Sequence, residues 1–265
     1  MSDYPVTLQA LVAVARRAGE CIMKHYGDEV AVRYKADESP VTAADLAAHQ
    51  SILDELIALT PGVPRLSEEA AAVPWAQRQA WTRYWLIDPL DGTREFIARN
   101  GEFTVNIALI EHGEPVMGVV HAPDLDETYY AARGQGAWMA TRRGSPAPML
   151  LAAAKVATPR VLVTRSHATE ALTALLNGLP AHEAVRVGSA LKFGRLAAGE
   201  GEFYPRVGPT SEWDTAAGHC VVAEAGGRVL AAGGQRLRYN QTPSLLNPDF
   251  SVAAPPCFAW QDTLP

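Results

Sequence analysis

Residues 85–96 read WLIDPLDGTREF, which sets two aspartates directly after a short apolar run. The apolar run predicts a buried strand that ends at Asp88, and Pro89 then predicts a turn. Asp88 and Asp91 are close enough on such a turn for their carboxylates to converge, with the backbone carbonyl of Leu90 as a further oxygen ligand. Oxygen-only ligation of this kind suits a hard cation such as Mg²⁺. An ordinary turn with side-chain caps is the alternative interpretation.

The two residues that follow favour an anion site beside the aspartates. Gly92 permits close approach of the backbone, and Thr93 begins what the pattern predicts to be a helical turn. Backbone N–H groups at the start of a helical turn face outward and attract an anion.

Three other segments carry carboxylates that could join this site. Glu68 stands in LSEE, where a solvated surface charge is the alternative. Asp214 begins a predicted helix in EWDTAAGHCVVAEAGG, where helix capping is the alternative. Asp45 follows Thr42 at capping-box spacing, and a functional Asp45 would hold or orient water near a metal.

Composition narrows the class of protein. The chain has 265 residues, of which 48% are hydrophobic and 20% charged, as in ordinary globular proteins. Its net charge of −6 argues against a nucleic-acid-binding surface. If the substrate is an anion, bound metal cations would have to supply the positive charge that attracts it. The three widely spaced cysteines argue against a disulfide framework or a zinc site and favour a reducing cytoplasm. No signal-peptide pattern and no membrane-spanning apolar run is expected.

Periodicity divides the chain into two parts. We expect residues 1–155 to form an N-terminal α+β part, with two amphipathic helices and a hairpin around residues 112–114, that carries most of the metal ligands. Residues 156–265 alternate strands and helices, which predicts a C-terminal α/β part that carries Asp214 and the substrate-specificity residues. The Pro- and Ala-rich stretch before the boundary is either a surface loop or a crossover.

The carboxylate segments, taken in order, resemble the inositol monophosphatase-like phosphatase superfamily. The strings that carry this resemblance are Glu68-Glu69, DPLDGT (88–93), WDTAAG (213–218) and EAGG (224–227). Within the superfamily the chain is most similar to the CysQ-type 3'(2'),5'-bisphosphate nucleotidases, through SPVTAAD (39–45), DPLDGTREF (88–96), TRSH (164–167) and the whole of 188–218. The resemblance implies a layered α-β-α-β-α sandwich, in the α+β or α/β class.

The resemblance also implies an activity and a set of roles. The activity is Mg²⁺-dependent, lithium-sensitive removal of the 3'-phosphate from adenosine 3',5'-bisphosphate, or from its sulfated form, within sulfur metabolism. Two or three Mg²⁺ per site are implied, with the ligands Glu68, Asp88, the Leu90 carbonyl, Asp91 and Asp214. Asp45 and Thr93 correspond to the pair that activates the attacking water. Substrate contacts are implied for Glu68, Gly92, Thr93, His167, Ser189, Lys192, Arg206 and Asp214.

Alternatives remain at this level. An inositol monophosphatase or another small phosphomonoester phosphatase on the same fold is one, and a non-catalytic metal-bound scaffold protein is another. The alternative for His167 is a loop histidine without a substrate contact. For Lys192 the alternative is a solvated charge, and for Arg206 it is a structural ion pair. Ser189-Ala190 departs from the Ser-Ser that is frequent in the family. The expected partner is a small phosphorylated nucleotide; peripheral inner-membrane association and oligomeric state are left open.

Overall fold

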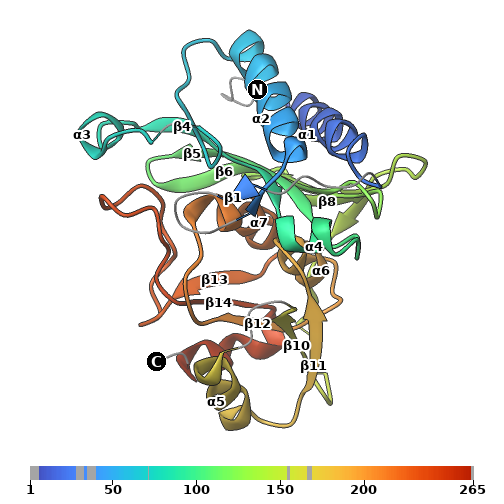
Figure 1. The fold of residues 1–265 in the computed structure, drawn as a ribbon. Coiled ribbons are helices and arrows are strands. Elements are labelled where there is room, and N and C mark those ends of the chain that lie inside the picture. The colour runs from blue at the N-terminus through green and yellow to red at the C-terminus, as the bar shows by residue number, and fades with distance from the viewer. Residues whose placement is uncertain are drawn as a thin grey trace.

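The computed structural model describes residues 6–27, 33–34, 40–70, 72–153, 156–165 and 169–263. Its helices and sheets stack as five layers in the order α-β-α-β-α (Figure 1). This arrangement confirms the layered sandwich that the resemblance implied.

Two long helices, α1 (Leu8–Met23) and α2 (Ala43–Leu59), form the outer layer at the top of Figure 1. Helix α2 begins where the spacing of Thr42 and Asp45 predicts. The hydroxyl of Thr7 accepts the N–H of Ala10 at 3.2 Å, and Thr42 with Asp45 forms a capping box. The buried faces of α1 and α2 pack on the first sheet, because their apolar residues recur at helical spacing.

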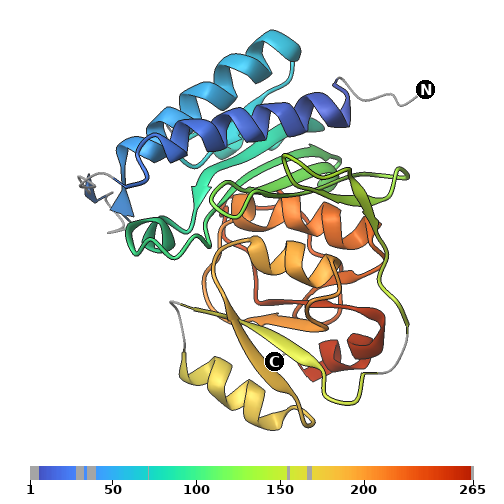
Figure 2. The same cartoon turned by 90° about the vertical axis from the view of Figure 1, so that its right-hand side faces the viewer.

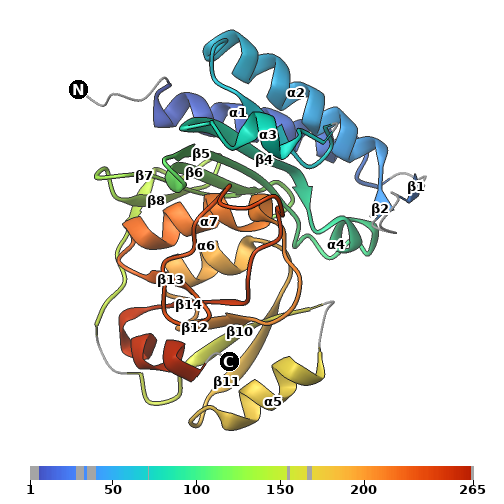
Figure 3. The same ribbon diagram turned by 90° about the vertical axis from the view of Figure 1, so that its left-hand side faces the viewer.

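The first sheet has seven strands in the order β3-β4-β5-β6-β7-β8-β9, and only the β3–β4 pair is parallel. Strands β5 and β6 form the predicted hairpin, and both faces of β5 are buried between helical layers. The strands are β3 (Arg65–Ser67), β4 (Arg83–Asp91), β5 (Thr104–Glu111), β6 (Glu114–Ala122), β7 (Glu127–Ala132), β8 (Ala137–Ala140) and β9 (Ala147–Met149). The short elements beside this sheet are β1 (Arg33–Tyr34), β2 (Pro40–Val41), α3 (Trp75–Arg78) and α4 (Thr93–Ile97). Figure 3 shows α4 and β2 at the same end of the molecule.

The middle layer consists of α6 (Leu191–Ala197) and α7 (Glu212–Glu224), enclosed between the two sheets (Figure 2). Helix α7 is buried around most of its circumference, as expected for a helix without a polar face. Its small residues allow close contact: a Cβ on Gly118 of β6 would overlap the backbone of Ala217, and a Cβ on Gly218 would overlap Phe193. The helix is therefore closely packed against both β6 and α6.

The second sheet has five strands in the order β11-β10-β12-β14-β13. The outer layer on its far side consists of α5 (Glu170–Gly178) and the 3₁₀ segment η1 (Pro255–Thr263). The alternation of strands and helices predicted for this half of the chain is confirmed. The strands are β10 (Arg160–Thr164), β11 (Glu183–Val187), β12 (Phe203–Arg206), β13 (Arg228–Ala231) and β14 (Phe250–Ala253).

The first sheet ends at residue 149 and the second begins at residue 160. Helix α7 nevertheless packs on strands of the first sheet. The division into parts 1–155 and 156–265 stays a prediction. Within the described ranges, each helix is too short or too polar to cross a bilayer.

The contact between α7 and β6 predicts a packing-sensitive position. Gly118→Ala should lower the free energy of unfolding by about 1–3 kcal/mol, because the new Cβ forces α7 away from the sheet. Urea denaturation measures this change. Gly178→Ala is the matched control, since nothing lies within 4 Å of its Cβ position. Equal free energies of unfolding for the two variants would contradict the close packing of α7 on β6.

Candidate metal centre and adjoining cavity

A β-bulge in β4 brings Asp88 and Asp91 to one face of the sheet. Residues three apart on a regular strand point to opposite faces. Asp88 pairs with Asn106 and Asp91 pairs with Thr104, so β4 holds one residue more than β5 in this interval. The extra residue restores the shared direction of the two carboxylates. The expectation that the strand ends at Asp88 is therefore wrong: it continues to Asp91, and Pro89 is tolerated because a bulge needs no N–H there.

Asp214 reaches the same point from the first turn of α7. Carboxylate oxygens of Asp88, Asp91 and Asp214 lie within 4.8 Å of one another. Asp214 also accepts the N–H of Ser211 at 2.9 Å, so it caps a helix that begins at Glu212, two residues earlier than expected. The capping interpretation is correct, and it leaves the carboxylate facing the other two.

Ionisation of the three carboxyl groups is costly because they lie close together in a poorly solvated place. Burial, and then repulsion from neighbouring carboxylates, raises the pKa of Asp88 and Asp214 well above the usual value. Burial raises the pKa of Asp91 to about 6, against the opposing influence of Lys192. A hard divalent cation bound to these oxygens would remove the repulsion, so the donor set fits such an ion.

Glu68 lies beside the cluster. Its N–H donates to the carbonyl of Ile87 on β4 at 3.1 Å, and its charge is a cause of the raised pKa of Asp88. Among the described residues, the group of oxygens within 4.8 Å does not include Glu68. The fold brings together three of the four predicted carboxylates, and the fourth is next to them.

Asp45 and Thr93 meet although 48 positions separate them in the chain. The hydroxyl of Thr93 donates to Asp45 Oδ1 at 3.2 Å and lies 3.5 Å from the carbonyl of Leu90. Asp45 Oδ2 accepts the N–H and the hydroxyl of Thr42 at 2.7 and 2.6 Å. Burial raises the pKa of Asp45, although the Thr42 hydrogen bonds lower it. The pair thus consists of a buried carboxylate and a hydroxyl group that lies beside the cluster.

A cavity of about 260 Å³ adjoins this centre. Its lining combines carboxylates with residues from α6, from β12 and from the turns that precede α6 and α7. Of the predicted substrate contacts, the cavity is lined by Glu68, Gly92, Thr93, Ser189, Lys192, Arg206 and Asp214. The cavity wall also contains residues that the sequence did not single out, among them Pro40, Thr164, Phe193, Tyr204 and Thr210. His167 lies outside the described residues, so its role stays a prediction.

Gly92 is required where it stands. Its φ of +89° is a left-handed conformation that residues with a Cβ adopt at a cost. A Cβ there would also lie only 3.2 Å from Ser189 and from the carboxylate of Glu95. The glycine therefore lets α4 begin directly beneath the cavity.

The two basic residues differ in their environment. Lys192 is only 5% exposed, so the solvated-charge interpretation is wrong. Its ammonium donates to the carbonyl of Ser189 at 2.6 Å, and burial lowers its pKa to about 8, against the pull of Asp91. Arg206 donates through Nε to Thr210 at 3.1 Å and through Nη2 to the Pro209 carbonyl at 2.7 Å. Arg206 keeps further N–H donors beside the cavity.

Two contacts of Asp91 were not predicted from the sequence. Its Oδ2 accepts the backbone N–H of Ala190 at 2.5 Å and the side-chain amide of Asn106 at 3.4 Å. Asn106 is the polar residue inside the apolar run FTVNIALI, and this break in the pattern could have identified it. A backbone amide leaves no such signal in the sequence.

Comparisons with known proteins agree with this geometry. The model of the inositol monophosphatase family matches residues 3–258. The chain is 49% identical to the 3'(2'),5'-bisphosphate nucleotidase CysQ of Salmonella typhimurium, over 92% of this chain and 98% of that protein. It is similar to the crystal structure of CysQ from Bacteroides thetaiotaomicron, with 39% identity, a TM-score of 0.80 and coverage of 94% and 97%. An IMPase from Thermotoga maritima superimposes with a TM-score of 0.82 at 26% identity, with coverage of 97% and 96%.

The cluster predicts cation-dependent stability. Mg²⁺ or Mn²⁺ at 100 times its dissociation constant should raise the free energy of unfolding by about 2.7 kcal/mol. Asp214→Asn should abolish this gain while it keeps the cap at Ser211, and without cation it should be no less stable because one repulsive charge is gone. Denaturation with and without cation measures both effects. Asp54→Asn, at an exposed position on α2, is the matched control; equal loss in the two variants would contradict the site.

Proposed function

This chain belongs to the inositol monophosphatase family, and we propose that it hydrolyses the 3'-phosphate of adenosine 3',5'-bisphosphate, giving AMP and phosphate. The observation that carries the proposal is one cavity lined both by carboxylates and by the basic pair Lys192 and Arg206. A substrate with two phosphates can then place one at the carboxylate centre and the other at the basic pair. The 49% identity to a bisphosphate nucleotidase, over nearly the whole of both chains, supports the same assignment.

We infer that the ion is Mg²⁺, with two or three per site. The oxygen-only donor set of Asp88, Asp91 and Asp214 supports a hard cation. Glu68, which raises the pKa of Asp88, and the Leu90 carbonyl, beside the Thr93 hydroxyl, would supply further oxygen ligands. When bound, the ions supply positive charge for the phosphate oxygens and lower the pKa of water. This charge explains how a protein of net charge −6 accepts a polyanion.

The protein's own groups would prepare the water. The Thr93 hydroxyl donates its proton toward Asp45, so its oxygen lone pairs face outward as an acceptor. A water that donates to Thr93 is thereby oriented for in-line attack on phosphorus, and Asp45 can take up the proton through the hydroxyl. The raised pKa of Asp45 makes it a stronger base than an exposed aspartate.

The basic pair Lys192 and Arg206 would select the nucleotide. Arg206 offers its remaining N–H donors to the second phosphate, while Lys192 adds a buried positive charge.

The free thiols of Cys21, Cys220 and Cys257 support the expectation of a reducing compartment.

A substrate panel tests the assignment. Phosphate release with Mg²⁺ is measured for adenosine 3',5'-bisphosphate, inositol monophosphate and fructose bisphosphate, and we expect the largest kcat/KM for the nucleotide. Arg206→Ala should raise the KM for the nucleotide by about 10-fold, because a charge-assisted contact is lost, with less effect on inositol monophosphate. A larger kcat/KM for inositol monophosphate would overturn the nucleotidase assignment. Unchanged turnover in Asp91→Asn would overturn the metal mechanism, and no turnover in wild type would favour a scaffold protein.

The water-orienting role predicts a split between two substitutions at one position. Thr93→Val should lower kcat by about 10²–10⁴-fold, the range of general acid–base contributions. Thr93→Ser keeps the hydroxyl and should retain most of the turnover. Steady-state kinetics at saturating Mg²⁺ separates these outcomes from a binding effect. Equal loss in both variants would speak for a packing role of the threonine methyl group.

A further inference from the structure

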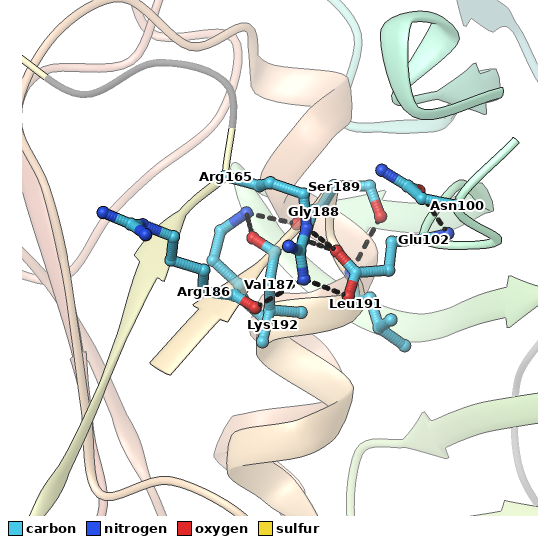
Figure 4. Close-up of polar contacts among 9 residues, drawn as sticks. All are labelled: Asn100, Glu102, Arg165, Arg186, Val187, Gly188, Ser189, Leu191 and Lys192. Carbon is cyan, nitrogen blue, oxygen red and sulfur yellow. Dashed lines mark hydrogen bonds and ion pairs between the residues drawn. The ribbon is translucent and has the colours of Figure 1, made fainter. Parts of the chain in front are cut away.

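The turn at residues 186–190, which comprises the last two residues of β11 and the three residues before α6, is held by charged side chains (Figure 4). This turn carries Ser189 and the Ala190 amide, which face the metal centre. The side chains that hold it come from the loop before β5, from the end of β10 and from α6 itself.

Glu102 holds the turn from one side. Its Oε2 accepts the N–H of Gly188 at 2.7 Å. Both of its oxygens also engage Arg165, each at 2.7 Å, and Arg165 Nη2 donates to the Arg186 carbonyl at 2.9 Å. Burial acts to raise the pKa of Glu102, but these hydrogen bonds outweigh it and lower the pKa, so the group is ionised at neutral pH. Neither Glu102 nor Arg165 lines the cavity.

Lys192 holds the turn from the other side. Its ammonium lies 2.6 Å from the Ser189 carbonyl and 3.3 Å from the Val187 carbonyl. A carboxylate therefore binds an N–H of the turn while an ammonium binds its carbonyls. A Cβ on Gly188 would collide with Glu95 and with Glu102, so the chain passes between them with no spare room.

The clamped turn has an unusual conformation. Ser189 has a φ of +45°, in the left-handed region that residues other than glycine rarely adopt. Strained residues persist only where their surroundings hold them. The result of this conformation is that the next amide, that of Ala190, points at Asp91 Oδ2 from 2.5 Å.

We propose that Glu102 is a positioning residue: by holding the 186–190 turn, it orients Asp91 for a divalent cation. Groups that orient the ligands of a metal commonly change its affinity by 10–100-fold when removed. The inference rests on the proposed function for its choice of ion, but it concerns binding and can be tested without turnover.

The test compares two ion pairs of the same kind. Calorimetric titration of the metal-free full-length protein with Mg²⁺ should show a dissociation constant about 10- to 100-fold larger for Glu102→Ala than for wild type. Glu55→Ala is the matched control: Glu55 pairs with Arg17 on the helical outer layer, and its side chain is 23% exposed against 18% for Glu102. The control should bind Mg²⁺ as wild type does, and both variants should lose only a few degrees in Tm.

A conservative variant guards against misfolding. Glu102→Gln keeps an oxygen for the Gly188 N–H and should bind Mg²⁺ more tightly than Glu102→Ala. Turnover of adenosine 3',5'-bisphosphate by Glu102→Ala should fall at low Mg²⁺ and recover at saturating Mg²⁺, whereas a merely structural defect would lower it at every concentration.

Three outcomes are decisive. Equal dissociation constants for Glu102→Ala, Glu55→Ala and wild type would overturn the inference. A wild type that binds Mg²⁺ but releases no phosphate from the nucleotide would overturn the proposed function alone, and the binding comparison would still decide the role of Glu102. Weakened binding confined to the Glu102 variants would support it.

Discussion

Three carboxylates, of which one is buried and two are half-buried, repel one another at the centre of this molecule, and the packing of α7 on the seven-stranded sheet brings them together. Gly118 and the small residues of α7 let the helix approach until its first turn meets the end of β4. Asp214 then faces Asp88 and Asp91 within 4.8 Å. Buried charges of one sign are costly unless an opposite charge compensates them. The fold therefore holds a site whose natural complement is a cation.

Unusual backbone geometry gathers around this centre. The bulge in β4 aims two aspartates in one direction, Gly92 turns left-handed to begin α4, and Ser189 does so without being glycine. Each departure serves to direct a polar group at the same small volume. Conformational strain is commonly found at such sites because the surrounding packing holds it in place.

The two basic residues of the cavity, Lys192 and Arg206, are also held by specific contacts. Lys192 is buried, yet its ammonium has carbonyl partners and interacts with the charge of Asp91. Arg206 is more open and keeps donors beside the cavity. One cavity thus combines carboxylates that suit a metal-bound phosphate with a basic pair that suits a second anion.

Elements with a long periodic pattern could be predicted from the chain. The helices α1 and α2, the β5–β6 hairpin and the strand–helix alternation after β10 were all expected, because their apolar spacing is repeated over many residues. The bulge in β4, the short helix α3 and the edge strand β9 were not. Their patterns are brief, and each depends on a neighbour: the bulge exists only in the pairing with β5.

By itself, the sequence determined the chemistry of the site: oxygen ligands of the right type, in the order Asp45, Glu68, Asp88, Asp91 and Asp214, on segments that could each be identified. It also determined the layered fold through the resemblance those segments carry. Only the tertiary structure decided which atoms meet. Asp91 accepts an amide from a residue 99 positions away, and Glu102 accepts one from a residue 86 positions away. Such contacts leave no local pattern, because a backbone N–H is the same in every residue and its direction is set by the packing around it.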